Sequence, residues 1–263
     1  MTTDMMNIAS NSDRAQSSIE AALIEIERSL YLSTSIHSIP DAEVAATFRA
    51  GLEWMKRFVM RPNPHLGRRG AVCPFARPVH EEPALYFCTF DCGDMNFETF
   101  VEIMLQVPKL YRRISAGFSG RSDLLSLCVF PTGLSAAAYY KFIDCAHSIL
   151  KPIYMSAGLM IGEFHPLSAV RGVHSDTIFP LRADVPFFAI RSTTAHDILF
   201  IDRESGSAGQ RIHELECYLS SAGQLLPDGE IARIRARIEQ LKSQLVSEND
   251  PADTIPPATT AVG

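Results

Sequence analysis

The sequence contains no apolar run long enough to cross a membrane. Its apolar stretches, such as 136–140 and 198–201, fall far short of the roughly 20 residues that span a bilayer. The first thirty residues also lack the basic start and apolar centre of a signal peptide. We therefore expect a cytoplasmic protein that has no membrane partner.

Positive charge is also scarce. The chain has 24 Lys and Arg residues against 30 Asp and Glu residues, which gives a formal net charge of -6. A broad nucleic-acid surface needs an excess of positive charge, so we expect no nucleic-acid partner. With 46% hydrophobic and 21% charged residues over 263 positions, the composition is that of an ordinary globular protein.

The motifs of several common enzyme classes are missing. No GxGxxG follows a predicted strand, and neither GxxxxGK[ST] nor GxSxG occurs, so dinucleotide-dependent dehydrogenases, P-loop enzymes and α/β-hydrolases have no support. The six cysteines lie mostly in apolar segments without tight spacing, and we expect free thiols. Cys73, His80, Cys88 and Cys92 could supply zinc ligands, but Cys-x3-Cys is not the usual zinc-knuckle spacing.

The hydrophobic pattern predicts an α+β fold. Two amphipathic helices come first, one near 19–30 and one that Asp41 can cap. The elements predicted after them are strand 84–90, helix 96–116 interrupted near Pro108, strand 124–130, helix 135–150, and strands 159–164 and 186–191. This β-α-β-α-β-β order predicts a mainly antiparallel sheet with helices on one face. Between the two N-terminal helices and the first of these strands, residues 61–83 hold five prolines and two glycines, which predicts a structured loop.

The predicted organisation has four parts. Residues 1–13 are expected to be disordered, 14–205 to form one α+β domain with the N-terminal helices, 206–247 to form a helical hairpin, and 248–263 to be a disordered tail. In the last helix, apolar residues at 231, 234, 238, 241 and 245 form a seam. That seam can close the hairpin or form a homodimer contact. Thr193 or Thr194 can cap a short helix before it.

The most informative stretch surrounds Cys73. A thiolate binds heme iron well, and the proline that follows it stiffens the chain and lacks an N–H, so Cys-Pro recurs as a heme-ligand dipeptide. Arg68, Arg69 and Arg77 lie within about five residues of it, where they could favour the thiolate and hold heme propionates. The alternative interpretations are a buried structural cysteine and solvated loop arginines.

Two further stretches carry candidate site residues. Glu163 and His165 end a predicted strand, where a histidine can bind a ligand or transfer a proton, or lie in an exposed loop. Arg191 ends another strand and can bind a carboxylate. Asp197 can receive a cation or cap a helix.

Together the segments HLGRRGAVCPF, GLMIGEFHP and VPFFAIRSTTAHDILFI resemble the bacterial heme-dependent L-arginine N-hydroxylases, a family related to the heme protein of D-cycloserine biosynthesis and to relatives in gramibactin-type siderophore pathways. The resemblance covers roughly residues 40–205. It implies an enzyme with heme b that hydroxylates the guanidino nitrogen of L-arginine to Nω-hydroxy-L-arginine in natural-product biosynthesis. It also implies an oxidant, either peroxide or oxygen delivered with a partner reductase.

The resemblance assigns roles to the residues above. Cys73 is the first choice for the iron ligand, because a thiolate pushes electron density toward O–O cleavage. His165 is the second choice, or a distal proton donor if Cys73 holds the iron. Glu163 or Asp197 would meet the guanidinium of the substrate, and Arg191 its carboxylate. The alternatives are an N-oxygenase of another amino acid such as lysine, a non-catalytic heme sensor or carrier, and a heme-free interaction protein.

Overall fold

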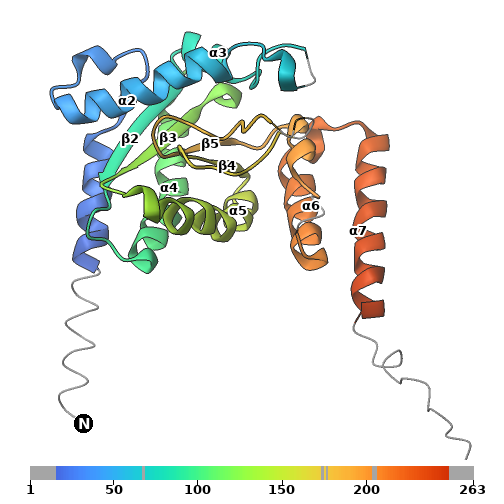
Figure 1. Cartoon of the computed structure of the whole chain (residues 1–263). Helices are drawn as coiled ribbons and strands as arrows, with labels where there is room; N and C mark the ends of the chain where they lie inside the picture. The colour runs from blue at the N-terminus through green and yellow to red at the C-terminus, as the bar shows by residue number, and fades with distance from the viewer. Residues whose placement is uncertain (1–15, 67–68, 173–174, 176, 203–205, 249–263) are drawn as a thin grey trace, which may run out of the picture. The chain divides into compact units, whose positions relative to one another are not determined.

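A computed structural model describes residues 16–66, 69–172, 175, 177–202 and 206–248 (Figure 1). The predicted disordered N-terminus, and the predicted tail from residue 249 on, lie outside these residues. The chain divides into two compact units, Met1–Ser192 and Thr193–Gly263. Among the described helices, none combines the length and the apolarity that crossing a membrane requires.

The first unit is built on a five-stranded sheet with the order β1-β2-β3-β5-β4. Strands β2 and β3 run parallel, and the other neighbours pair antiparallel. The prediction of an α+β fold with a mostly antiparallel sheet is therefore confirmed. The strands are β1 (Tyr31–Leu32), which was not predicted, β2 (Leu85–Asp91), β3 (Ser126–Thr132), β4 (Leu159–Phe164) and β5 (Phe187–Ser192).

Each face of the sheet carries its own apolar cluster. Successive strand residues point to opposite faces, so Cys88 and Phe90 of β2 join one cluster while Leu85 and Phe87 join the other. The first face is covered by a helix at 16–28, by α4 (Phe97–Gly117) and by α5 (Ala146–Ser156). The second face is covered by α2 (Ala42–Trp54) and α3 (Ala76–Glu81) (Figure 1). Helices α4 and α5, which connect strands, thus share one face as predicted, whereas the N-terminal helices divide between the two.

Helix α2 begins where the sequence indicates. The Asp41 carboxylate accepts hydrogen bonds from the backbone N–H groups of Glu43 (2.9 Å) and Val44 (3.0 Å), which satisfies two donors that have no partner within the helix. The helix then continues as a turn of π-helix, η2 (Met55–Val59). The short 3-10 helices of this unit are η1 (Ile36–Ser38), η3 (Pro64–Leu66), η4 (Ser122–Leu124) and η5 (Ala136–Ala138).

The segment predicted to be a loop contains a helix, so that prediction is wrong for Ala76–Glu81. Pro78 does not prevent this helix because it lies in the first turn. The N–H groups there have no acceptor within the helix, so a proline loses no hydrogen bond.

The predicted interruption of α4 is also wrong. Pro108 lies inside one continuous helix of 21 residues. A proline in a helix interior cannot donate to the carbonyl four residues earlier, here that of Met104. The hydroxyl of Tyr154 donates to this carbonyl instead, at 2.6 Å.

The helix predicted at 135–150 extends further and changes its winding. It runs from η5 through a π-helical segment, η6 (Tyr140–Cys145), into α5, which ends at Ser156. Such π-helical segments widen a helix locally and occur frequently at functional sites.

The second unit contains the C-terminal helices. They are η7 (Ala195–Phe200), α6 (Ala208–Ala222), η8 (Gly223–Leu225) and α7 (Asp228–Glu248). Helices α6 and α7 pack against each other, and Ile234, Ile238 and Leu241 of α7 are buried, as the predicted hairpin requires. Asp202 links the two helices of this unit, because it accepts hydrogen bonds from Arg211 of α6 (2.6 Å) and Arg237 of α7 (2.8 Å).

Candidate functional site

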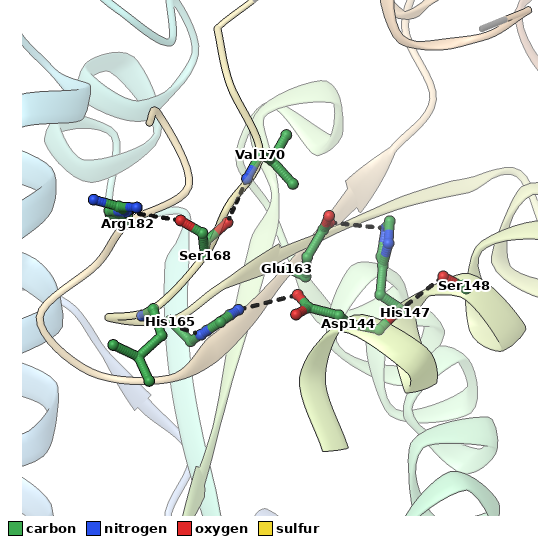
Figure 2. A network of polar contacts seen from close by, with 9 residues as sticks. Asp144, His147, Ser148, Glu163, His165, Ser168, Val170 and Arg182 are labelled. Carbon is green, nitrogen blue, oxygen red and sulfur yellow. Dashed lines mark hydrogen bonds and ion pairs between the residues drawn. The ribbon is translucent and has the colours of Figure 1, made fainter. Parts of the chain in front are cut away.

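A polar network joins the end of β4 to the helix that precedes it (Figure 2). Glu163 lies on β4 and points to the same face as Ile161, which belongs to the apolar cluster under α4 and α5. His165 follows the end of the strand. Both side chains meet residues of η6 and α5.

His165 is almost fully buried, with 2% of its surface exposed. Its Nε2 lies 3.0 Å from Oδ1 of Asp144, and its Nδ1 accepts the backbone N–H of Leu167 at 3.2 Å. A neutral imidazole has one donor and one acceptor, so these contacts place the proton on Nε2. Both ring nitrogens are therefore engaged.

In the second pair the helix contributes the histidine and the strand contributes the carboxylate. Nε2 of His147, on α5, lies 3.1 Å from the Glu163 carboxylate and 3.0 Å from the carbonyl oxygen of Ile161, and both side chains are only 15% exposed. Helix and strand each contribute one carboxylate and one imidazole, and we call this set the two histidine–carboxylate pairs.

Only the strand half of this network, Glu163 and His165, was predicted from the sequence. Asp144 and His147 were missed, although both lie in the segment predicted to be a helix at 135–150. Their spacing of three residues places them on one side of a helix, which is the signal available in the sequence. The sequence does not show which strand that side contacts.

Chemically, a carboxylate that accepts from an imidazole fixes its tautomer and orientation, as in general acid–base sites. In His165 this arrangement leaves no ring nitrogen without a bond, so iron ligation would require breaking the contact with Asp144 or with Leu167.

Cys73 lies over the other face of the sheet. Its backbone N–H donates to the carbonyl of Val59 at 2.9 Å, which fastens the loop to the end of η2. The neighbouring Phe58 ring packs on Trp54, and Trp54 packs on Phe164 of β4, with ring centroids 5.8 Å and 5.5 Å apart. The thiol is partly exposed.

Arg191 connects the same loop to β5. Its guanidinium lies over the ring of Phe75, 5.1 Å from the centroid, and donates to the carbonyl of Ser192 at 3.0 Å. On β5, Phe187 and Ala189 pack in the second cluster, so the alternation puts Arg191 on that face too. Ala189 pairs with Gly162 of β4, so the strand residues at this position have small side chains.

The other predicted cofactor residues are distributed as follows. Arg77 donates to the carbonyl of Met60 at 3.0 Å and so braces the loop. Arg69 is exposed, and Arg68 lies outside the described residues.

The structure does not bring all the predicted site residues together. Cys73 and Arg191 lie on one face of the sheet, and Glu163 and His165 lie on the other. Asp197 belongs to the second unit, where it is fully buried and forms a capping box with Thr194, whose N–H it accepts at 2.7 Å. The geometry shows this capping role directly.

The four residues considered for zinc also do not converge. Cys88 and Cys92 are buried, and burial raises the pKa of both thiols. His80 contacts the Ser33 hydroxyl at 2.7 Å, and burial, with Lys56 as a second cause, lowers its pKa. Within the described ranges, no group of three or more His, Cys, Asp and Glu side chains has the geometry to hold a metal ion.

A family model described as a domain of unknown function (DUF6875) matches residues 48–232. The chain belongs to this family. No curated protein and no solved structure matches the chain. The DUF6875 region contains every predicted site residue and both histidine–carboxylate pairs, while the helix at 16–28 lies before it. The DUF6875 description names no activity, and the resemblance to heme-dependent N-hydroxylases goes beyond this match.

Proposed function

We propose that this protein is a heme b-dependent enzyme that hydroxylates the guanidino nitrogen of L-arginine, with Cys73 as the iron ligand. The observation that carries the proposal is the setting of Cys73. Cys73 is partly exposed, its backbone N–H donates to the carbonyl of Val59, next to the Phe58 ring, and Phe75, two residues on, packs against Arg191.

The residue types on this loop support the proposal of a heme. A heme site of this type needs a thiolate, apolar and aromatic surroundings, and cationic groups for the propionates. Cys73, the rings of Phe58 and Phe75, and Arg69 and Arg77 would supply these groups. When bound, a thiolate-ligated heme supplies the O–O cleavage that N-hydroxylation of a poorly nucleophilic guanidinium requires.

The chain's own residues position the reactants in this proposal. The hydrogen bond from the Cys73 N–H to the Val59 carbonyl fixes the backbone at the proposed ligand, and Pro74, the next residue, stiffens the chain there. The planar guanidinium of Arg191, oriented by Phe75, is suited to bind the α-carboxylate of an amino acid with two parallel hydrogen bonds.

The decisive experiment is heme content combined with ligand substitution. Protein expressed with sufficient heme is expected to carry about one heme per chain in a pyridine hemochromogen assay. Cys73→Ser should lose heme or shift the Soret band, and the ferrous carbonyl complex of the wild type should absorb at the thiolate position. Cys145→Ser is the matched control, because Cys145 is also partly exposed but lies in η6.

The outcomes separate the alternatives. A colourless protein that does not take up added hemin contradicts the heme proposal and leaves a heme-free interaction protein. A Cys73→Ser variant with an unchanged spectrum, together with a heme-free His165→Ala variant, would assign the ligand to His165.

The substrate is tested with the heme-loaded protein. L-Arginine should perturb the spectrum more than citrulline or lysine, and should gain one oxygen in mass spectrometry with peroxide or with oxygen and a reductase. Arg191→Ala should weaken the arginine response by roughly 10- to 100-fold, the equivalent of a lost charge-assisted bond. Heme binding without turnover of arginine or lysine would instead indicate a sensor or carrier.

A further inference from the structure

Helix α6 of the second unit carries a histidine and a cysteine one turn apart. His213 is exposed and Cys217 is partly exposed. The buried residues of the helix, among them Ile212, Leu215 and Tyr218, lie on its other side. The pair is therefore accessible from solvent, and a spacing of four residues makes the two side chains neighbours along the helix.

The two side chains already have the spacing of zinc ligands. Sγ of Cys217 lies 3.6 Å from Nε2 of His213. With Zn–N at about 2.0–2.1 Å and Zn–S at about 2.3 Å, a tetrahedral angle at the metal puts the nitrogen and the sulfur about 3.5 Å apart. Thiolate sulfur and imidazole nitrogen are also the two ligand types that structural zinc sites use most. A zinc ion could thus be bound by this pair with no change of backbone.

We propose that His213 and Cys217 form half of a zinc site, and that the same pair from a second copy of the chain completes it. A structural zinc site takes four protein ligands, and a two-fold dimer presents any surface pair twice, which yields a Cys2His2 set.

The surroundings of the pair suit a second helix. By helical periodicity, the exposed residues that share or border this side are Gly209, Gln210, Glu216, Ser220 and Ser221. Four of them are small or uncharged, and the charge of Glu216 is paired with Lys242 of α7 at 3.2 Å, so two α6 helices can approach around the metal. The thiol of Cys217 gives up its proton on binding, so zinc uptake should release protons and weaken at acidic pH.

The test uses the full chain and adds Zn²⁺ or Co²⁺. We expect one metal ion per two chains, a sulfur-to-cobalt charge-transfer absorption with Co²⁺, and a doubling of the mass by light scattering that a chelator reverses. The variant His213→Ala/Cys217→Ser should remain monomeric and bind neither metal at this site. The matched control, His196→Ala/Cys145→Ser, removes one histidine and one cysteine elsewhere and should behave as the wild type.

Two results would overturn the proposal. Metal binding by His213→Ala/Cys217→Ser that equals the wild type would show that the pair is not the site. One zinc per chain with an unchanged mass would show that zinc does not join two copies. The readouts need no heme, and the double variant leaves Cys73 intact, so the zinc proposal stands or falls separately from the heme proposal.

Discussion

The hydroxyl of Tyr154 takes the place of a backbone amide for Met104. It donates a 2.6 Å hydrogen bond to the carbonyl that Pro108, four residues further along α4, cannot reach. Tyr154 is fully buried, so water does not supply this bond if the hydroxyl is removed. A side chain of α5 thus stabilises the proline-containing turn of α4.

Removing this hydroxyl should destabilise the first unit. We expect Tyr154→Phe to lower the free energy of unfolding by about 1–3 kcal/mol, because a buried carbonyl loses this donor while the ring keeps its packing. Urea denaturation followed by circular dichroism measures the change.

A double-mutant cycle provides the control. Pro108→Ala restores an N–H that can donate to Met104, so Tyr154→Phe should cost less in that background than in the wild type. An equal cost in both backgrounds would show that the hydroxyl does not compensate for the proline.

Alkaline pH should destabilise the protein through its buried tyrosines. Burial raises the pKa of Tyr111 and Tyr154, and raises that of Tyr218 to about 12. An unfolded tyrosine titrates near pH 10, so above that pH the unfolded state releases protons that the folded state retains. This stabilisation is complete below about pH 10 and for Tyr218 disappears as the pH rises through 12.

The measurement is the free energy of unfolding in urea at several pH values from about 8 to 11. The buried cysteines, whose thiol pKa values are also raised, act in the same direction from about pH 8.5. In Tyr154→Phe the free energy of unfolding should therefore fall less steeply with pH above pH 10 than in the wild type, and equally steeply below it. A slope identical to that of the wild type would contradict the assignment to Tyr154.

The contact between Asp144 and His165 should contribute measurably to stability. Asp144→Ala leaves the enclosed Nε2–H of His165 without its acceptor and should cost about 1–3 kcal/mol. Asp144→Asn keeps an oxygen at the same place and should cost less. The comparison is Asp184→Ala, which removes an exposed ion pair with Arg57 and should cost under about 1 kcal/mol.

Differential scanning calorimetry of these three variants distinguishes the contributions. If Asp144→Ala is no more destabilising than Asp184→Ala, the contact of Asp144 with His165 does not contribute to holding η6 against the end of β4.

Asp197 is expected to act as a helix cap. Its carboxylate accepts from the N–H of Thr194, so Asp197→Ala should lower stability by about 0.5–2 kcal/mol, and Asp197→Asn by less. Thermal unfolding measures the loss. If Asp197→Asn instead leaves stability unchanged but abolishes the spectral response to arginine, the substrate role given to this residue by the resemblance is supported.

Local signals in the sequence predicted the main elements well. The Asp41 cap, the seam of α7 and the strand bounds of β4 depend on neighbours within a few positions, and the sequence shows those neighbours. The prediction of a break at Pro108 was wrong because the compensating donor, Tyr154, is distant in the sequence. Residues 76–81 were predicted as loop because a count of prolines does not show that Pro78 occupies a first turn.

The candidate site was harder to predict for a related reason. Glu163 and His165 were identified from the end of a strand, but their partners come from a helix whose contact face only the folded chain defines. Alternation along β4 and β5 also places Arg191 and Glu163 on different faces of the sheet. The sequence does not reveal this, because it does not show how the two strands pair. Spatial grouping therefore had to come from the structure.

The strand order has a consequence for synthesis of the chain. In the described sheet β4 pairs only with β5, yet β5 is the last strand to be made. While the ribosome is adding the residues between them, β4 has no strand to pair with, and an unpaired strand is prone to aggregation. Segments η6 and α5 are already complete by then, and their contacts through Asp144 and His147 provide an early local partner. These contacts would shield the nascent strand until β5 arrives.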